Sequence, residues 1–148
     1  MVSFDTNILV YATGAAPDPK TERARDIIAR GMRSGWSVLL LQTLAEFSSV
    51  AIRKAGIPVD DIRTTIDAWR AVLPVQAAED DDLAAALDAV KMHRLGFWDA
   101  MLWASAQRAG VRHFLTEDLQ DGFVLQGVRF VNPFKRANDG LIDEILPP

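Results

Sequence analysis

The chain has 148 residues, of which 49% are hydrophobic and 24% charged, values typical of one soluble globular domain. It contains no cysteine, which excludes disulfides, thiolate catalysis and cysteine-ligated zinc, and no apolar run approaches the roughly 18–20 residues that span a bilayer. The net charge is −4, without the basic balance that is usual for nucleic-acid enzymes. The N-terminal residues carry neither the basic region nor the apolar stretch of a secretory signal, so we expect a cytoplasmic protein.

Short apolar runs alternate with longer helical patterns along the chain. In chain order we expect a strand at residues 2–4, a turn at 17–19, a helix at 21–32, a strand at 37–40, a helix at 42–56, a helix at 60–72, an edge strand at 73–75, a helix at 83–94, a helix at 98–109, and strands at 113–115 and 128–131. This alternation, without hairpin signals, predicts an α/β domain with a mostly parallel sheet.

Two of the expected helices have informative compositions. The helix at residues 83–94 places Leu83, Leu87 and Val90 on one stripe, which we expect to face the core. The acids at residues 79–82 are favourable partners of the dipole at its start. The helix at residues 98–109 is apolar on nearly every side, which is typical of a helix buried in the middle of a domain.

The domain is expected to end near residue 134. The tail at residues 135–148 is polar apart from four apolar residues at helical spacing. These are Leu141, Ile142, Ile145 and Leu146. The tail is therefore expected either to dock as a helix or to contact a partner.

Two acids follow expected strands. Asp5 comes directly after the first strand and Asp118 follows the strand at residues 113–115. Parallel α/β sheets bind ligands at the carboxyl ends of their strands, so both acids are candidates for one site. Each also reads as an ordinary turn residue that bonds its own backbone.

Two further acids lie near helix starts. Glu46 follows Thr43 at the spacing of a capping box, in which its carboxylate accepts from the backbone N–H of Thr43. Asp99 begins an otherwise apolar helix, so it is expected to be partly buried and to need a partner. The sequence pattern alone does not place Asp99 at the same edge of the sheet as the other three acids.

Carboxylates that converge on one edge repel one another, and a divalent cation relieves that repulsion. An all-oxygen site suits Mg²⁺ or Mn²⁺, whereas zinc and copper usually require His or Cys ligands. The two histidines, His93 and His113, lack metal-ligand spacing.

Four short segments together resemble the PIN-domain family and, within it, the VapC-type toxins of bacterial toxin–antitoxin pairs. The resemblance runs from residue 2 to about residue 134. Its four segments are Phe-Asp-Thr-Asn-Ile-Leu at 4–9, Leu-Ala-Glu-Phe at 44–47, Phe-Trp-Asp-Ala at 97–100 and Leu-Thr-Glu-Asp at 115–118. It implies a three-layer α/β/α PIN-like fold with a parallel sheet of four or five strands.

The resemblance also implies which residues form the site. Asp5, Glu46 and Asp99 match the family's three most dependable acids, which places Asp99 beside the others. Asp118 is the natural match for the fourth acid, with Glu117 and Asp121 as alternatives. The small polar residues expected to support the carboxylates or metal-bound water are Thr6, Asn7 and Thr116.

The activity implied is endonuclease cleavage of RNA with Mg²⁺ or Mn²⁺ at these four acids. A toxin of this type would act with a small antitoxin and as a homodimer, and Trp36 and Trp69 are candidates for such contacts or for core packing. The alternative is a non-catalytic PIN-like module that binds RNA or a protein.

Overall fold

A computed structural model describes residues 1–14 and 18–148. Its strands are β1 (Val2–Phe4), β2 (Leu39–Leu40), β3 (Val75–Gln76), β4 (His113–Leu115), β5 (Val124–Leu125) and β6 (Val128–Val131). Its helices are α1 (Thr6–Thr13), α2 (Thr21–Ser34), α3 (Leu41–Arg53), α4 (Val59–Arg70), α5 (Asp80–His93), α6 (Phe97–Arg108), the 3₁₀ turn η1 (Arg136–Asn138) and α7 (Asp139–Ile145). The expected turn at residues 17–19 falls partly on Pro17, which lies outside the described residues. Within the described part of the chain, no helix has the length and apolar character needed to cross a membrane.

The main sheet has the strand order β1-β4-β6-β5. The pairs β1–β4 and β4–β6 are parallel, and β5 joins β6 as an antiparallel hairpin. The short strands β2 and β3 form a separate parallel pair, which a single bridge between Val2 and Ser37 connects to β1. The predicted α/β class with a mostly parallel sheet is confirmed, whereas the two-residue strand β5 was not anticipated from the sequence.

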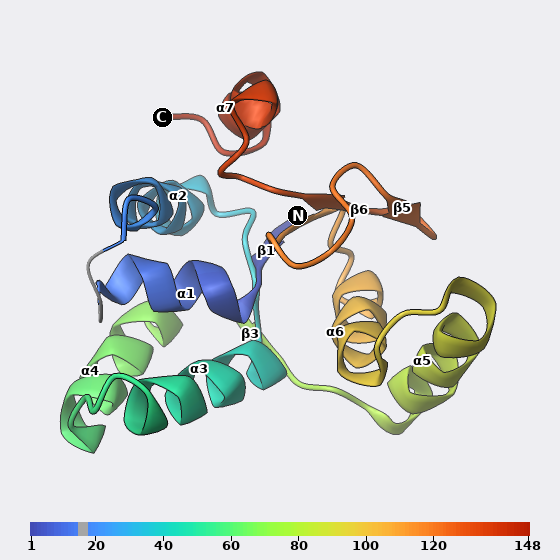
Figure 1. Cartoon of the computed structure of the whole chain (residues 1–148), viewed down its shortest axis with the longest axis horizontal. Coiled ribbons are helices and arrows are strands. Elements are labelled where there is room, and N and C mark those ends of the chain that lie inside the picture. The colour runs from blue at the N-terminus through green and yellow to red at the C-terminus, as the bar shows by residue number, and fades with distance from the viewer. Residues whose placement is uncertain (15–17) are drawn as a thin grey trace.

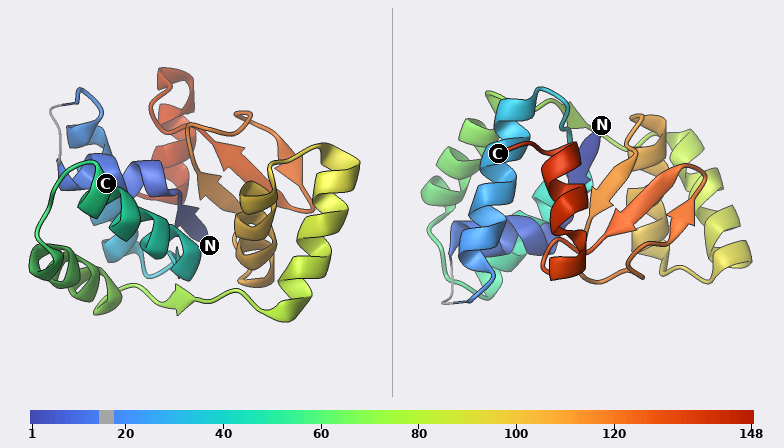
Figure 2. Two further views of the ribbon diagram at one scale, coloured as in Figure 1. Left: turned by 60° about the horizontal axis from the view of Figure 1, so that its bottom comes forward. Right: turned by 90° about the horizontal axis from the view of Figure 1, so that it is seen from above.

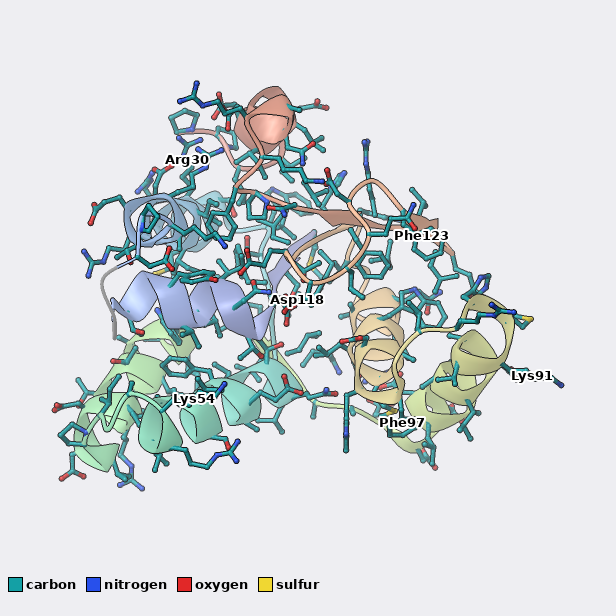
Figure 3. All side chains as sticks on the ribbon, in the orientation of Figure 1. Arg30, Lys54, Lys91, Phe97, Asp118 and Phe123 are labelled. Carbon is teal, nitrogen blue, oxygen red and sulfur yellow. The ribbon has the colours of Figure 1, made fainter. Side chains whose placement is uncertain are left out.

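The sheet separates two hydrophobic clusters. Successive strand residues point to opposite faces, so Leu115 packs into one cluster and the neighbouring Phe114 into the other. Helices α1 to α4 and α7 line the first cluster, and α5 and α6 line the second. Figures 1 and 2 show α7 and α6 on opposite sides of β6, and Figure 3 shows side chains filling the space between the layers. This is the three-layer arrangement.

Helix α2 approaches β1 closely at a glycine. A Cβ built on Gly31 would lie 2.5 Å from Cζ of Phe4, which is closer than two carbon atoms can pack. Phe4 is fully buried and directly precedes Asp5. The missing side chain of Gly31 therefore lets Phe4 hold the end of β1 in place.

Helix α5 buries a different face from the one expected. Leu83 and Leu87 are 45% and 54% exposed, while Ala86 and Ala89 are buried against α6. Their small side chains let the two helices approach closely. The acid Asp82 is also buried, because Arg108 and Ser105 of α6 bind its carboxylate. The assignment of Leu83 and Leu87 to the core was wrong.

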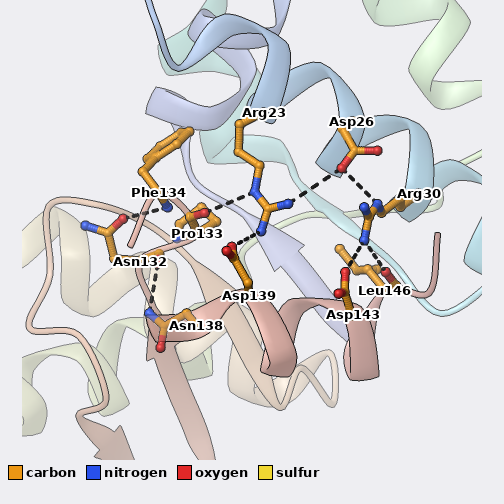
Figure 4. A network of polar contacts seen from close by, with 10 residues as sticks. All are labelled: Arg23, Asp26, Arg30, Asn132, Pro133, Phe134, Asn138, Asp139, Asp143 and Leu146. Carbon is orange, nitrogen blue, oxygen red and sulfur yellow. Dashed lines mark hydrogen bonds and ion pairs between the residues drawn. The ribbon is translucent and has the colours of Figure 1, made fainter. Parts of the chain in front are cut away.

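The C-terminal segment packs on α2 as helix α7 (Figure 4). Ile142 and Leu146 are fully buried in the first cluster. Arg23 of α2 binds Asp139 at 2.8 Å, and Arg30 binds Asp143 at 2.6 Å. Apolar burial and two ion pairs therefore hold α7 against α2, while the division of the chain at residue 134 stays a prediction.

The two tryptophans considered for partner contacts differ in burial. Trp69 is buried, and its ring centroid lies 5.1 Å from that of Phe47. Trp36 is 69% exposed. Core packing explains Trp69, and Trp36 alone of this pair presents its ring to solvent.

Candidate functional site

Asp5 lies at the carboxyl end of β1 and caps α1. Its backbone N–H donates to the carbonyl of Leu115, which fixes it beside the end of β4. Its carboxylate accepts from the backbone N–H of Thr6 at 2.7 Å and from Oγ1 of Thr116 at 2.6 Å. The side chain of Asn7 adds a longer bond of 3.3 Å. Asp5 is therefore held rigidly at 8% exposure.

Burial is the main reason that the pKa of Asp5 is raised, to about 6. The hydrogen bonds from Thr116 and Thr6 oppose that rise, because they favour the ionised form. The negative charges of Asp118 and Glu46 raise the pKa further. Asp118 and Glu46 are therefore close enough to Asp5 for their charges to act on its ionisation.

Asp118 follows β4 and shares its partners with Asp5. Its backbone N–H donates to Oγ1 of Thr116, the same hydroxyl that donates to Asp5. Nδ2 of Asn7 donates to Asp118 at 3.0 Å as well as to Asp5. Asn7 and Thr116 therefore connect the acids that follow two neighbouring parallel strands.

Glu46 lies in the second turn of α3 and faces the start of α1. It accepts from Oγ1 of Thr6 at 3.0 Å and from Nε2 of Gln42 at 2.8 Å. The capping-box interpretation is wrong, because α3 begins at Leu41 and Thr43 lies inside the helix, fully buried. The side chain of Glu46 is free of a capping role and points toward Asp5 and its neighbours.

Asp99 lies in the first turn of α6 and is half-buried. Nε2 of Gln42, which binds Glu46, also donates to the backbone carbonyl of Trp98 at 3.2 Å. This contact links the start of α6 to α3. The pKa of Asp99 is raised by burial first and then by the charges of Asp118 and Glu46, so the structure brings Asp99 near these two acids.

The two alternatives for the fourth acid are engaged elsewhere. Glu117 binds Tyr11 and Lys20, one with each carboxylate oxygen. Asp121 accepts from the backbone N–H of Asn132 at 2.9 Å and binds Lys135 at 3.2 Å. Burial alone would raise the pKa of Asp121, but these contacts outweigh it and lower the pKa. Of the three acids after β4, Asp118 alone contacts Asn7.

The four carboxylates have no basic partner in the described part of the chain. Among the described residues, no Lys, Arg or His forms an ion pair with Asp5, Glu46, Asp99 or Asp118. In the arrangement seen here, residues 1–14 and 18–148 include no group of three or more His, Cys, Asp or Glu side chains placed to hold a metal ion. The charges of Asp118 and Glu46 raise the pKa of Asp5 and of Asp99, and the neutral donors Asn7, Thr6 and Thr116 bind the carboxylates of Asp5, Asp118 and Glu46.

Sequence reasoning missed Gln42, whose amide joins two of the elements that carry the acids. A signal was present, because Gln42 precedes Glu46 by four residues and side chains at this spacing meet on a helix. Its second contact, with the carbonyl of Trp98, crosses 56 residues and has no local signal.

Comparison with known proteins gives one family and a set of related folds. The family model described as PIN domain matches residues 2–122. No curated protein matches in sequence.

Three solved structures share the fold. A toxin–antitoxin complex from Klebsiella pneumoniae has a TM-score of 0.64 at 19% identity, with 91% of this chain and 99% of that chain covered. The sarcin–ricin loop cleaving toxin VapC20 of Mycobacterium tuberculosis has a TM-score of 0.63 at 18% identity, with 77% and 87% covered. FitAcB from Neisseria gonorrhoeae has a TM-score of 0.61 at 18% identity, with 90% and 99% covered. The family match spans well over half of the chain, and the chain belongs to the PIN domain family.

Proposed function

We propose that this protein is a Mg²⁺- or Mn²⁺-dependent endoribonuclease whose site comprises Asp5, Glu46, Asp99 and Asp118. The observation that carries the proposal is the convergence of four carboxylates from β1, α3, α6 and the loop after β4. Burial and the charges of Asp118 and Glu46 raise the pKa of both Asp5 and Asp99, and no described basic side chain pairs with either. A perturbed, unpaired acid cluster at the carboxyl edge of a sheet is typical of a functional site.

The donor chemistry of this cluster fits a hard divalent cation. All four side chains supply oxygen ligands, which Mg²⁺ and Mn²⁺ prefer. The side-chain oxygen of Asn7 is buried and has no hydrogen-bond partner, although its amide nitrogen serves both Asp5 and Asp118. A buried oxygen without a partner next to two carboxylates supports the binding of a cation or its water shell.

In the proposed mechanism Asp5, Asp99 and Asp118 would hold the ion, and Glu46 would either join them or orient the attacking water. A bound ion of this kind acidifies a water molecule and neutralises charge on the phosphate. Thr116 and Asn7 fix the carboxylates of Asp5 and Asp118, and Thr6 and Gln42 fix that of Glu46. All four of these supporting donors are neutral, so none of them offsets the charge of the carboxylates.

Cleavage of RNA by the purified, folded protein tests the proposal. We expect cleavage with Mg²⁺ or Mn²⁺, none with EDTA, and none for Asp5→Asn. Asp81→Asn is the matched control, because Asp81 is an exposed acid at the start of α5. Equal cleavage by Asp5→Asn and the wild type, or no cleavage under any of these conditions, would overturn the proposal.

A non-catalytic PIN-like binding module is the second candidate. The observation that favours it is the absence of a preformed metal group among the described side chains. Titration with Mn²⁺ separates the two, since Trp98 and Trp103 flank Asp99 and report on an ion bound there. A saturable change in tryptophan emission that Asp5→Asn abolishes supports the nuclease. RNA binding by the wild type without any RNA cleavage supports the binding module.

We further propose that the nuclease is the toxin of a type II toxin–antitoxin pair, held inactive by a small antitoxin and active in the cytoplasm as a homodimer. Support comes from the related folds, one of which is described as a toxin–antitoxin complex and another as a toxin that cleaves the sarcin–ricin loop. A short antitoxin-like reading frame immediately upstream is expected. Its product should co-purify with this chain and inhibit cleavage. Light scattering that gives the mass of a monomer would contradict the homodimer.

A further inference from the structure

Trp98 presents a large aromatic surface to solvent next to the acid cluster. Trp98 is 66% exposed. This is a high value for tryptophan, because exposing its large apolar surface to water costs more free energy than exposing a smaller side chain. Phe97, exposed at 38%, packs edge-on against it with ring centroids 5.2 Å apart. An exposed aromatic pair of this kind marks a contact surface.

The contacts of the backbone place Trp98 at the rim of the site. It directly precedes Asp99 in the first turn of α6, and its carbonyl accepts from Gln42, which also binds Glu46. Figure 3 shows Phe97 at the start of α6 and Asp118 beside the neighbouring loop. A hydrogen bond therefore fixes the backbone of Trp98. Trp98 lies one residue from Asp99 and is linked to Glu46 through the side chain of Gln42.

The charge of this region limits how RNA can be bound there. The four acids repel phosphate groups, and none of them is ion-paired with a described Lys or Arg. Stacking of a base on an aromatic ring involves no phosphate and tolerates every base, because each base has a π-face. It does require a base that is not already stacked and paired in a duplex.

We propose that Trp98 stacks on an unpaired nucleobase next to the cleaved phosphodiester. This proposal rests on the proposed function. Stacking supplies binding energy that does not depend on the metal ion, and it positions the RNA backbone beside Asp99.

Trp36 is the natural control. Its exposure, 69%, matches that of Trp98. Its carbonyl accepts from the backbone N–H of Val2 at the start of β1, whereas Asp5 follows the end of that strand. The two tryptophans thus offer equal aromatic surface at opposite edges of the sheet.

The experiment measures binding of a fluorescently labelled single-stranded RNA oligonucleotide by anisotropy, in EDTA and at about 0.15 M salt, where the Debye length is about 8 Å. The proteins are the wild type, Trp98→Ala, Trp98→Phe, Trp98→Leu and Trp36→Ala. We expect Trp98→Ala to weaken binding about 5- to 150-fold, the range that corresponds to stacking of one base. Trp98→Phe should retain most of the affinity, Trp98→Leu should not, and Trp36→Ala should bind like the wild type.

Three results would overturn the proposal. The first is that Trp98→Ala or Trp98→Leu binds RNA as tightly as the wild type. The second is that the wild type binds a duplex as well as a single strand. The third is that light scattering shows dissociation of a dimer by Trp98→Ala. The last result would assign the ring to a second copy of the chain.

Cleavage assays with Mg²⁺ keep this proposal separate from the proposed function. We expect Trp98→Ala to raise KM and leave kcat unchanged. Cleavage with an unchanged KM would overturn the stacking and leave the nuclease standing. RNA binding that depends on Trp98, without any cleavage, would support the stacking and overturn the nuclease.

Discussion

Asp5 and Asp82 are both buried aspartates at helix starts, and their surroundings act on them in opposite directions. They are 8% and 3% exposed. Asp82 accepts from Ser105 at 3.0 Å, from Nε of Arg108 at 2.9 Å and from the backbone N–H of Glu79 at 2.9 Å. Burial alone would raise its pKa, but these contacts lower it, whereas the pKa of Asp5 is raised.

Burial alone therefore does not distinguish the proposed site acid Asp5 from Asp82, whereas the charge of the neighbouring groups does. Asp82 has a guanidinium partner, Arg108, and the contact between them helps to hold α5 against α6. Asp5 has neutral donors and two acidic neighbours, an arrangement that destabilises the ionised form until a cation is supplied. Four predictions test this contrast, in order of decreasing effect.

The largest effect is expected in the loop after β4. There Asp121 is paired with Lys135, whereas Asp118, three residues earlier, has no described basic partner. Asp118→Asn should reduce RNA cleavage about 100-fold or more, since loss of even an outer-shell partner of a metal ligand costs about 10–100-fold. Asp121→Asn should leave cleavage nearly unchanged and lower Tm, because it loses the contact with Lys135 and weakens that with Asn132. The reverse pattern would show that Asp121 is the fourth acid.

The second prediction concerns pH. In EDTA, the contribution of Asp5 to the free energy of unfolding should fall as pH rises from about 4 to about 6, because native Asp5 keeps its proton where the unfolded chain has lost it. Relative to Asp5→Asn, the loss above pH 6 should reach about 3 kcal/mol for a shift of this size. Urea titrations of both proteins across this range measure it. Parallel pH profiles would show that Asp5 ionises normally. Asp82 acts with the opposite sign, and its contribution is lost as pH falls below about 4, through its lowered pKa.

The third prediction is that Asp82→Ala lowers the free energy of unfolding by about 2 kcal/mol, since it leaves the buried Ser105 hydroxyl and Arg108 without their acceptor. Tm should fall by about 4–8 °C for a chain of this length. The neighbouring exposed acid supplies the control, and Asp81→Ala should change Tm little. If both variants melt alike, the Asp82 network adds nothing to the packing of α5.

The smallest effect is expected from the ion itself. Mn²⁺ at ten times its Kd should stabilise the wild type by about 1.4 kcal/mol and leave Asp5→Asn unchanged. Thermal melts with and without the ion measure the shift. An equal rise of Tm in both proteins would place the ion elsewhere.

Much of the fold followed from local patterns. Asp5 and Asp118 could be placed at one edge because each follows a strand and the strands are parallel. The buried face of α5 could not be found, because apolarity favoured Leu83 and Leu87, while the real face depends on Arg108, 26 residues beyond Asp82.

The candidate site also contains contacts that the sequence could not predict. The expected partner of Glu46 was the nearby Thr43, but its actual partners are Gln42 on the same helix and Thr6, which lies 40 residues away. Asp99 was placed by resemblance alone, since the contact that brings α6 to α3 is made by the Gln42 side chain across 56 residues. Pairings between distant elements have no periodicity for a sequence pattern to reveal.

The two hydrophobic clusters on either side of the sheet have a consequence for metal affinity. Glu46 belongs to a helix that packs in the first cluster, and Asp99 to a helix that packs in the second. An ion bound by both would act as a cross-link between the two halves of the domain. Substitutions that loosen α6 from far away, such as at the buried Ala86 of α5, are then expected to weaken metal binding. Hydrogen exchange at the start of α6 should slow when the ion is added.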